Sequence, residues 1–341
     1  MRNIDCRLTP CAWWPRVLAV ALVLQLLPAS SLAQQFTLVE YNVENIFDTR
    51  HDEGKQDEEY LPDATRRWTE KRYKKKLNQI GKSILSTTAD AIPDLVALCE
   101  VENDQVLHDL TKRSLLRHAG YEYVMTESPD ARGVDVALMY SPFTFSLIRS
   151  YGLRIETIEG MRPTRDILYA CGELQSGDTL HVFVVHAPSR HGGEKASRPF
   201  RRQAADRLLL AVDSLRALSP QANILITGDF NDYHDSPALE YLGEHGLTNI
   251  TKGARGDNGA EGTYRYRGEW GSLDHVLVSP RLSERVDTTF IHAPRFLLEE
   301  DKMYGGYLPS RTYKGMKYQK RGYSDHLPLV ARFRFGVTDR L

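Results

Sequence analysis

Polar side chains that could bind a cation or a phosphate follow several apolar runs in this sequence. The clearest case is the run from Ile224 to Asn231, in which Asp229 and Asn231 stand two residues apart after a β-rich segment. In an extended backbone such a pair projects to one side, so a carboxylate and an amide would be delivered together. Oxygen ligands on a rigid strand suit a hard cation or a phosphate. The alternative is an Asx-rich turn that only ends the strand.

Similar groups stand at the ends of other predicted strands. They are Glu44, Glu100, Asp274 and Asp325, with His186 at the end of a further run and His326 directly after Asp325. Side chains at strand ends converge in α/β folds, so we expect these groups to meet. Clustered carboxylates need a cation, a shared proton or a basic neighbour to stay close. Oxygen ligands without Cys or clustered His favour Mg²⁺, Mn²⁺ or Ca²⁺ over Zn²⁺.

This set of side chains predicts direct hydrolysis of a phosphoester. Asp229 would orient and deprotonate a water, Asn231 would hold it, and two histidines would donate to the charge that develops on phosphorus. Four arginines are candidates for a phosphate clamp: Arg132, Arg165, Arg190 and Arg201. The sequence has neither a Gly-x-Ser-x-Gly motif nor a Gly-x-x-x-x-Gly-Lys loop, so water attack fits better than a covalent intermediate or nucleotide-driven transfer.

An alternation of strands and helices must position these groups. Strands are predicted at residues 36–43, 95–100, 121–125, 134–140, 167–174, 179–185, 224–227, 273–278 and 329–335. Helical spacing occurs near Leu77–Leu85 and over 105–119 and 200–218, whereas 188–199, 232–272 and 295–322 read as loops and turns. No repeat or linker interrupts the pattern, so one α/β domain is predicted for residues 34–341.

The first 33 residues have the plan of a secretory signal peptide. Arg2, Arg7 and Arg16 give a positive start, an apolar run follows over 17–27, and a small-x-small site ends at Ala33. The run is too short for a comfortable membrane span, although a retained short anchor is the alternative. We therefore expect export to a periplasm or the medium after cleavage near Ala33, with no transmembrane segment in the mature chain.

Net charge and cysteine content narrow the classes of protein to which the chain can belong. The formal net charge of the 341-residue chain is -1, so any nucleic-acid binding must come from a local patch. The basic stretch Arg66–Lys76 is either a solvated helix face or a patch that follows phosphates. After the leader only Cys99 and Cys171 remain, which excludes a disulfide scaffold. Buried free thiols are favoured, and a single bridge stays open.

The ordered set of motifs resembles the endonuclease/exonuclease/phosphatase superfamily, over residues 36–335. The matching segments are Tyr41–Glu44, Leu98–Glu100, Arg132–Ala137, Val185–His186, Gly228–Asn231, Leu273–His275 and Ser324–Pro328. The resemblance implies a four-layer α/β sandwich, in which two packed mixed β-sheets are flanked by helices. It also implies Mg²⁺-dependent hydrolysis of a phosphoester, with Mn²⁺ or Ca²⁺ as substitutes.

The resemblance also implies roles for single residues. Glu100 matches the chief metal ligand, with Asn42, Glu44 and Asp325 close by. Asp229 and Asn231 match the pair that places the water, and His326 matches the histidine that pairs with Asp274 and contacts the scissile phosphate. His186 matches the histidine of the deoxyribonuclease and sphingomyelinase branches. The loop 188–193 resembles a secreted bacterial branch that usually has Trp where this chain has Ala187, so the shape of this loop is in doubt.

Several of these residues have structural alternatives. His275 follows Asp274 and would point to the other face of the strand, so a packing role is favoured. Tyr264 and Tyr266 could stack on a base or a sugar, but alternate strand positions favour a packed face. Arg165 stands beside Asp166, and a surface ion pair explains it as well as a phosphate contact.

Three functions stay open on the sequence. A nuclease acting on DNA or RNA would need a basic or aromatic groove, for which Arg66–Lys76, Tyr264–Arg267 and Arg311–Arg321 are candidates. A phosphatase or phospholipase-type hydrolase of a small or lipid phosphoester would need a narrower pocket or an apolar rim, such as Met303 and Tyr304. A binding protein on a dead catalytic fold would lack a key acid or histidine, and none is missing. The resemblance favours the nuclease, with a monomer as the default state.

Overall fold

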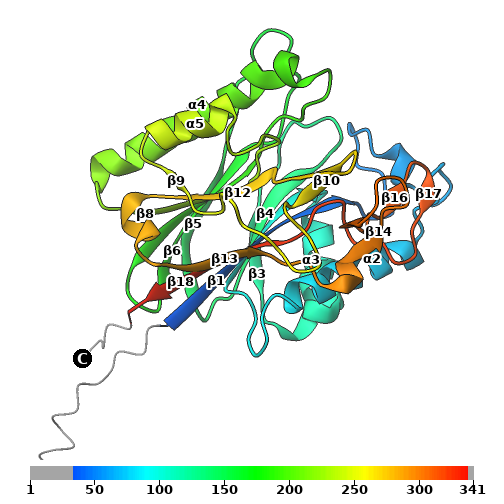
Figure 1. Cartoon of the computed structure of the whole chain (residues 1–341), viewed down its shortest axis with the longest axis horizontal. Helices are drawn as coiled ribbons and strands as arrows, with labels where there is room; N and C mark the ends of the chain where they lie inside the picture. Colours follow the sequence, from blue (N-terminus) through cyan, green and yellow to red (C-terminus); the bar gives the residue numbers. More distant parts are fainter. Residues whose placement is uncertain (1–33, 337–341) are drawn as a thin grey trace, which may run out of the picture.

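Two six-stranded β-sheets packed face to face form the centre of the molecule (Figure 1). The computed structural model describes residues 34–336, so the signal peptide expected over 1–33 lies outside the described residues. The first sheet contains, in spatial order, β13 (Val286–Ile291), β18 (Leu329–Phe335), β1 (Gln34–Ile46), β2 (Leu95–Val101), β4 (Asp135–Tyr140) and β3 (Glu122–Met125). The second contains β5 (Phe145–Leu153), β6 (Ile167–Leu174), β7 (Thr179–His186), β8 (Asn223–Asp229), β12 (Asp274–Val278) and β9 (Thr248–Asn249).

Both sheets are mixed. β1 pairs in parallel with β2, and β7 pairs in parallel with β8, whereas the other strand pairs of the two sheets are antiparallel. Three two-stranded hairpins complete the strands: β10 (Tyr264–Tyr266) with β11 (Glu269–Gly271), β14 (Leu298–Glu300) with β15 (Tyr307–Pro309), and β16 (Tyr313–Lys314) with β17 (Lys317–Tyr318).

Helices cover the outer face of each sheet. α2 (Glu70–Leu85) and α3 (Asp104–Arg113) pack on the first sheet, and α4 (Glu194–Leu218) and α5 (Pro237–Glu244) pack on the second (Figure 1). The remaining helices are short: α6 (Pro280–Ser283), η1 (Glu58–Tyr60), η2 (Leu115–His118) and η3 (Arg295–Leu297). The four-layer α/β sandwich predicted from the sequence is therefore confirmed.

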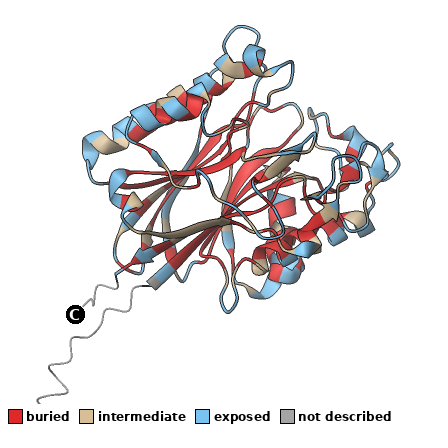
Figure 2. Ribbon diagram, in the orientation of Figure 1, coloured by how far each residue is buried: buried red, intermediate tan, exposed pale blue. Residues whose placement is uncertain are grey.

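Burial explains why the central strands read as unbroken apolar runs. Every residue of β8 and of β4 is buried, because one face of each strand meets the other sheet and the other face meets helices (Figure 2). One apolar cluster fills the space between the sheets. A second cluster lies between the first sheet and its helices, and a third lies between the second sheet and its helices. Cys99 and Cys171 are buried and free, as predicted.

Some elements differ from the sequence prediction. The helix expected over 105–119 stops at Arg113, where Ser114 accepts from the backbone N–H of Leu116 and starts η2. α4 begins at Glu194, inside a segment predicted as a loop. The strands β5 and β13 and the helix α5 were not predicted, because β5 is an edge strand with mixed exposure and α5 is only 8 residues long.

Within residues 34–336, no helix combines the length and apolar character that crossing a bilayer would require.

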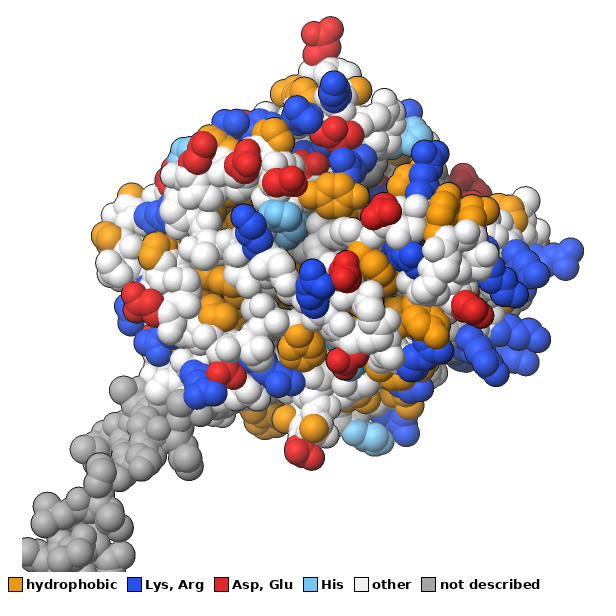
Figure 3. Space-filling model, in the orientation of Figure 1, with side chains coloured by type: hydrophobic (Ala, Val, Ile, Leu, Met, Phe, Trp, Pro, Cys, Tyr) orange, Lys and Arg blue, Asp and Glu red, His pale blue; other side chains and the backbone are white. Residues whose placement is uncertain are grey.

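The basic stretch Arg66–Lys76 is only partly the solvated face that was favoured for it. Lys74 is exposed and pairs with Glu70 at 3.0 Å, but Lys76 is fully buried. Lys and Arg side chains gather where α2 and the β16–β17 hairpin form one edge of the molecule, at the right of Figure 3.

Candidate active site

Strand register brings three of the predicted catalytic side chains into one row. His186 ends β7 and pairs with Asp229 of β8, and Asp229 pairs in turn with Asp274 of β12. All three side chains are buried. Because neighbouring strands lie about 4.8 Å apart, residues in register project close together. The row therefore forms at the end of the second sheet without any contribution from flexible loops.

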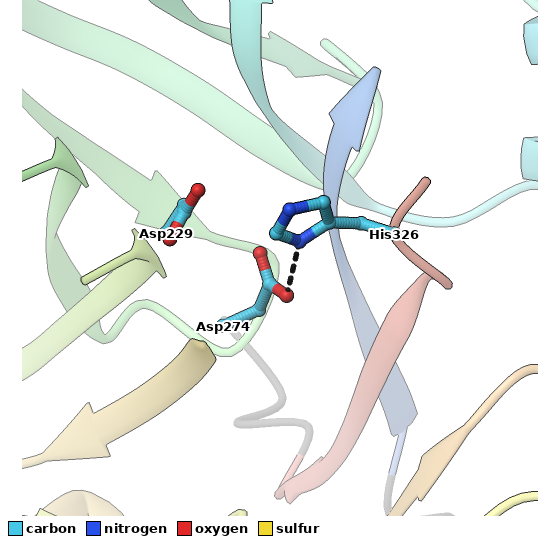
Figure 4. A group of neighbouring side chains, drawn as sticks. All are labelled: Asp229, Asp274 and His326. Atoms are coloured by element: carbon cyan, nitrogen blue, oxygen red, sulfur yellow. Dashed lines mark hydrogen bonds and ion pairs between the residues drawn. The ribbon is translucent and has the colours of Figure 1, made fainter. Parts of the chain in front are cut away.

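His326 reaches this row from the first sheet. It precedes β18, and its Nδ1 lies 2.7 Å from Oδ2 of Asp274, which comes from the other sheet (Figure 4). Ser324 fixes the segment, because its Oγ donates to the backbone oxygen of Asn42 at 2.7 Å and accepts from the N–H of His326 at 3.1 Å. The ring of Tyr264 lies 5.0 Å from the His326 ring and supports it from the side.

The two histidines have opposite electrostatic settings. Burial alone would lower the pKa of His326, but the carboxylates of Asp274, Asp229 and Asp325 outweigh it and raise the pKa well above the usual value. Burial, reinforced by Arg165 and Arg132, lowers the pKa of His186 well below the usual value. His326 is therefore an imidazolium at neutral pH, whereas His186 is a neutral imidazole.

Two hydrogen bonds hold the Asp229 carboxylate, and a histidine lies nearby. Its Oδ1 accepts from the backbone N–H of Asn231 at 2.7 Å, and its Oδ2 accepts from Nδ2 of Asn42 at 3.0 Å. Nε2 of His186 lies 3.7 Å from the same Oδ2, which is too long for a hydrogen bond. Burial and the nearby carboxylate of Asp274 raise the pKa of Asp229 to about 7.

Asn231 does not lie in extended backbone, so the same-side projection expected for Asp229 and Asn231 was wrong. Asn231 has φ 51°, and the chain turns sharply after Asp229. The Asx turn is therefore present, and Asn231 also lines the cleft that opens over these groups. Positive φ values recur at Glu44 (52°), Asn45 (49°) and Glu100 (67°). Such strained backbone persists where surrounding structure holds it, and it clusters at functional sites.

Sequence reasoning missed one acid beneath the row. Glu40 of β1 is completely buried, and the carboxylate of Asp274 is among the groups that act on it. Oε2 of Glu40 and Oδ1 of Asp274 are both buried without a hydrogen-bond partner among the described residues. Burial and the carboxylates of Asp274 and Asp229 raise the pKa of Glu40 well above the usual value. The available signal was its position two residues before Asn42, on the same face of the strand.

A wide cleft of about 1090 Å³ opens over these groups. Arginines from three loops line one part of the cleft, and tyrosines from the segments after β8 and in β10 line another. The arginines are Arg132, Arg162, Arg165 and Arg190, and the tyrosines are Tyr233, Tyr264 and Tyr266. The packed face favoured for these two tyrosines holds for Tyr264, whose ring packs on His326, but is wrong for Tyr266, which is 56% exposed. His275 has the packing role expected: it is buried, with Nε2 2.9 Å from the backbone oxygen of Asp232.

The four arginines proposed as a clamp have different surroundings. Arg190 stacks on the ring of Tyr233, 4.7 Å from its centroid, at the cleft. Arg132 also lines the cleft, with Nη1 3.7 Å from Oε1 of Glu100. Arg165 borders the cleft too, but it is buried and engaged by Asp130 at 3.1 Å and by the backbone oxygen of Ala187.

Arg201 does not belong to the clamp. It is buried under α4, where its Nε lies 2.7 Å from Oδ2 of Asp232 and its Nη1 donates to Oγ of Ser197. It does not line the cleft. Its phosphate role was a wrong prediction, because an isolated arginine in a sequence carries no sign of the buried carboxylate that it meets in the fold. The surface ion pair with Asp166, which was the alternative for Arg165, does not form, since Asp166 pairs with Arg154 at 2.9 Å.

The residues predicted as metal ligands lie around the junction of two cavities. Asn42, Glu100 and Asp325 line the catalytic cleft. Glu44 lines a smaller adjoining cavity of about 220 Å³, where its Oε2 accepts from the backbone N–H of Thr312 at 2.5 Å. Burial and the neighbouring carboxylate of Asp325, only partly offset by Lys76, raise the pKa of Glu44 to about 7.

These residues fit a hard divalent cation. Carboxylate and amide oxygens predominate, and the crowding that raises the pKa of Glu44 is what a bound cation would relieve. Asp229, Asp274 and His326 also offer ligand atoms within 4.8 Å of one another, so this buried group could bind a metal. An ion there would displace the bond between His326 and Asp274, however, whereas Glu100 and Asp325 are half-buried and reachable from the cleft.

Comparisons with known proteins agree with this geometry. A model of the Endonuclease/Exonuclease/phosphatase family matches residues 37–334 of the chain. No curated protein matches the sequence.

Solved structures share the fold at low sequence identity. A Bacteroides thetaiotaomicron protein of the endonuclease/exonuclease/phosphatase family is 15% identical, with a TM-score of 0.60, and the match covers 90% of this chain and 100% of that one. The B. thetaiotaomicron mannosyl-6-phosphatase is 16% identical over 87% and 98% of the two chains, with a TM-score of 0.57. The human Nocturnin catalytic domain, solved with a bound sulfate anion, is 18% identical over 89% and 96%, with a TM-score of 0.55.

Proposed function

The chain belongs to the endonuclease/exonuclease/phosphatase family of phosphoester hydrolases, and on that premise we propose that it is an exported, Mg²⁺-dependent nuclease that cleaves DNA or RNA by direct attack of water. The observation that carries the proposal is the cleft, in which arginines and tyrosines border the acid–base groups. A phosphodiester has substituents on both sides of its phosphorus. Guanidinium groups suit neighbouring phosphates, and aromatic rings suit bases or sugars.

Asp229 is the group that orients and deprotonates the attacking water. Its two oxygens are held by Asn42 and by the N–H of Asn231, so the carboxylate has a defined direction. Asn231 donates Nδ2 to the backbone oxygen of Ala187 at 3.0 Å, which leaves its amide oxygen to accept from the water. A new P–O bond forms to the water oxygen, and the water proton passes to Asp229.

His326 donates to the phosphate oxygens as negative charge develops on them. Its Nδ1 is engaged by Asp274, so the proton on Nε2 is the one available to substrate. Nε2 of His186 lies 3.9 Å from Glu100 and 3.7 Å from Asp229, and as a neutral imidazole it donates without adding charge. The bond from phosphorus to the leaving oxygen then breaks. A divalent cation held by Glu100, Asp325, Glu44 and Asn42 would supply charge stabilisation for the leaving oxygen when bound.

The experiment that tests this function uses the mature chain from residue 34 with plasmid DNA, RNA, bis-p-nitrophenyl phosphate and p-nitrophenyl phosphate, with Mg²⁺ or with chelator. Asp229→Ala is the active-site variant, and Asp206→Ala, at an exposed carboxylate paired with Arg202, is the matched control. Nicking of DNA or RNA that requires Mg²⁺, persists in the control and disappears in Asp229→Ala supports the nuclease. Polymers left intact by active enzyme contradict it.

The alternative is a phosphatase or phospholipase-type hydrolase of a small or lipid phosphoester. Exposed apolar side chains beside the cleft favour it, because Met303 is 80% exposed and Tyr304 packs on the Gly268 turn next to Tyr266. Release of p-nitrophenol from the monoester, with DNA and RNA untouched, would support this alternative. A catalytically dead binding protein is disfavoured, since the bonded pair of His326 and Asp274 is intact. Export rests on the leader over residues 1–33 and is tested by the N-terminal sequence of the secreted form.

A further inference from the structure

The smaller cavity beside the catalytic cleft contains two of the carboxylates that would hold the cation, Glu44 and Asp325, but its arginines have no role in the steps above. Arg66 and Arg311 line it, together with Tyr60, Thr312 and Tyr313. Asn45 and Asp325 line both cavities, so a group bound in the smaller one lies beside a substrate bound in the cleft. A volume of about 220 Å³ holds a phosphate group with several waters.

Arg66 is built into this cavity as a fixed cation. Its guanidinium lies 5.0 Å from the ring centroid of Tyr60 and 4.9 Å from that of Tyr313. Nε pairs with Oε2 of Glu59 at 2.9 Å. The rings and this ion pair hold the guanidinium plane in place, so little side-chain freedom is lost when a ligand binds. The terminal nitrogens remain as the donors for that ligand.

Arg311 brings a second guanidinium to the same cavity. Its Nη2 donates to Oδ2 of Asp325 at 2.8 Å, so it is anchored at the boundary with the cleft. The carboxylate of Glu44, which also lines the cavity, accepts from the N–H of Thr312 and lies 4.0 Å from Nζ of Lys76, so it has partners of its own. Phosphate suits this place, because planar guanidinium groups bind its oxygens with two donors each.

A buried lysine, Lys76, connects the segments that form the rest of the cavity wall. Nζ of Lys76 donates to Oγ1 of Thr312 at 2.6 Å and to the backbone oxygen of Tyr323, and it lies 4.0 Å from Oε2 of Glu44. These contacts join α2 to the segment that carries Arg311. Exposed lysines on α2, including Lys74 and Lys75, add positive potential outside the cavity (Figure 3).

We propose that the cavity formed around Arg66 and Arg311 binds a second phosphate group of the substrate, next to the phosphoester that is cleaved. The proposal rests on the phosphoesterase function proposed above and narrows its substrate class to molecules with at least two phosphates. The source of the second phosphate is either the adjacent linkage or end of a polynucleotide, or the second phosphate of a small bisphosphate.

The test compares substrates that differ by one phosphate. The thymidine dinucleotide TpT, its 5′-phosphorylated form pTpT and its 3′-phosphorylated form TpTp are cleaved by the wild type, by Arg66→Gln and by Arg67→Gln. Arg67 is the exposed neighbour and provides the matched control, since it does not line the cavity. We expect kcat/KM for one phosphorylated form to exceed that for TpT by roughly tenfold or more, the size of one charge-assisted contact. This ratio falls to near one in Arg66→Gln and persists in Arg67→Gln.

A second pair of substrates, a sugar bisphosphate and the corresponding sugar monophosphate, separates the two sources. An Arg66-dependent preference for the bisphosphate with dinucleotides uncleaved assigns the cavity to small bisphosphates. An Arg66-dependent preference among the dinucleotides assigns it to polynucleotides. Equal kcat/KM within each wild-type pair overturns the proposal, as does an Arg66→Gln variant that loses the same factor on every substrate.

Binding separates failure of this proposal from failure of the proposed function. If no phosphoester is hydrolysed, the catalytic proposal fails, but fluorescence anisotropy with labelled TpT, pTpT and TpTp and the metal-free protein still tests the cavity. Tighter binding of a phosphorylated form by the wild type, lost in Arg66→Gln at an unchanged melting temperature, supports the second phosphate site. Equal binding of all three ligands overturns it.

Discussion

Nδ1 of His326 lies 2.7 Å from Oδ2 of Asp274, and this bond joins the two β-sheets at the catalytic cleft. Asp274 belongs to β12 of the second sheet, and His326 precedes β18 of the first. The pair exists only when the sheets are packed, so catalysis depends on the centre of the fold. Glu40 lies buried near the pair, where burial and the carboxylates of Asp274 and Asp229 raise its pKa well above the usual value.

Asp274→Asn is expected to lower kcat by roughly 10²–10⁴-fold. The substitution removes the main charge that raises the pKa of His326 and leaves the imidazole neutral at lower pH. Activity is lost as the pH rises through the pKa of His326, so the basic limb of the pH–rate profile should move to lower pH in the variant. Asp206→Asn, at an exposed position, should leave the profile unchanged. An unaltered profile in Asp274→Asn would contradict the role given to the pair.

Lys76→Met is expected to destabilise the protein by roughly 3–5 kcal/mol. The substitution leaves the hydroxyl of Thr312 and the backbone oxygen of Tyr323 buried without their cationic partner, and it removes the cation that lies 4.0 Å from Glu44. Lys75→Met, one residue away on the exposed face of α2, is the matched control and should change stability by less than about 0.5 kcal/mol. Urea unfolding of both variants at neutral pH measures the difference. Similar midpoints for the two variants would mean that the buried lysine contributes nothing beyond its packing.

Glu102→Gln is expected to flatten the pH dependence of stability on the alkaline side. Burial, followed by the carboxylates of Asp48, Asp52 and Asp57, raises the pKa of Glu102 to about 9. The folded state therefore holds a proton that the unfolded chain releases near pH 4.5, so this group lowers stability as the pH rises from 4.5 to 9. The free energy of unfolding can fall by about 1.4 kcal/mol for each pH unit in this range.

Glutamine cannot ionise, so the stability of Glu102→Gln relative to the wild type should increase steadily between pH 5 and pH 9, measured as the free energy of unfolding in urea. Glu122→Gln changes an exposed carboxylate, and its free energy of unfolding should differ from that of the wild type by a constant amount over the same pH range. A constant difference between Glu102→Gln and the wild type at all pH values would show that Glu102 ionises normally.

Gly228→Ala is expected to prevent folding or to cost more than about 4 kcal/mol. A Cβ at this position would lie 1.9 Å from the backbone oxygen of Val185, and the backbone has φ 138°. Relief of this clash would push β7 away from β8 and separate His186 from Asp229. Gly243→Ala in α5 meets no atom within 4 Å and should stabilise the helix by about 0.5–1 kcal/mol. A well-folded Gly228→Ala with normal activity would contradict the close approach of these strands.

Local sequence patterns were sufficient to predict the central strands and the row at their ends. The runs before His186 and Asp229 and the run after Asp274 are apolar because both faces of their strands are covered, and that signal depends on composition alone. The order of these motifs along the chain indicated the family and, through it, the four layers. Edge strand β5 escaped prediction, because a half-covered strand at a sheet edge carries no such signal.

Partners that meet across the fold were decided only by the tertiary structure. Glu40, Lys76 and Arg201 look like surface residues in the sequence, yet each is buried beside a group of complementary chemistry that is distant along the chain or on another element. A buried charge is tolerated only with such a partner, and periodicity within one segment cannot say which segment will supply it. The sequence by itself determined which groups stand at the strand ends. Packing of the two sheets decided that His326 meets Asp274, that Arg201 binds Asp232 instead of substrate, and that Arg66 and Arg311 share a cavity.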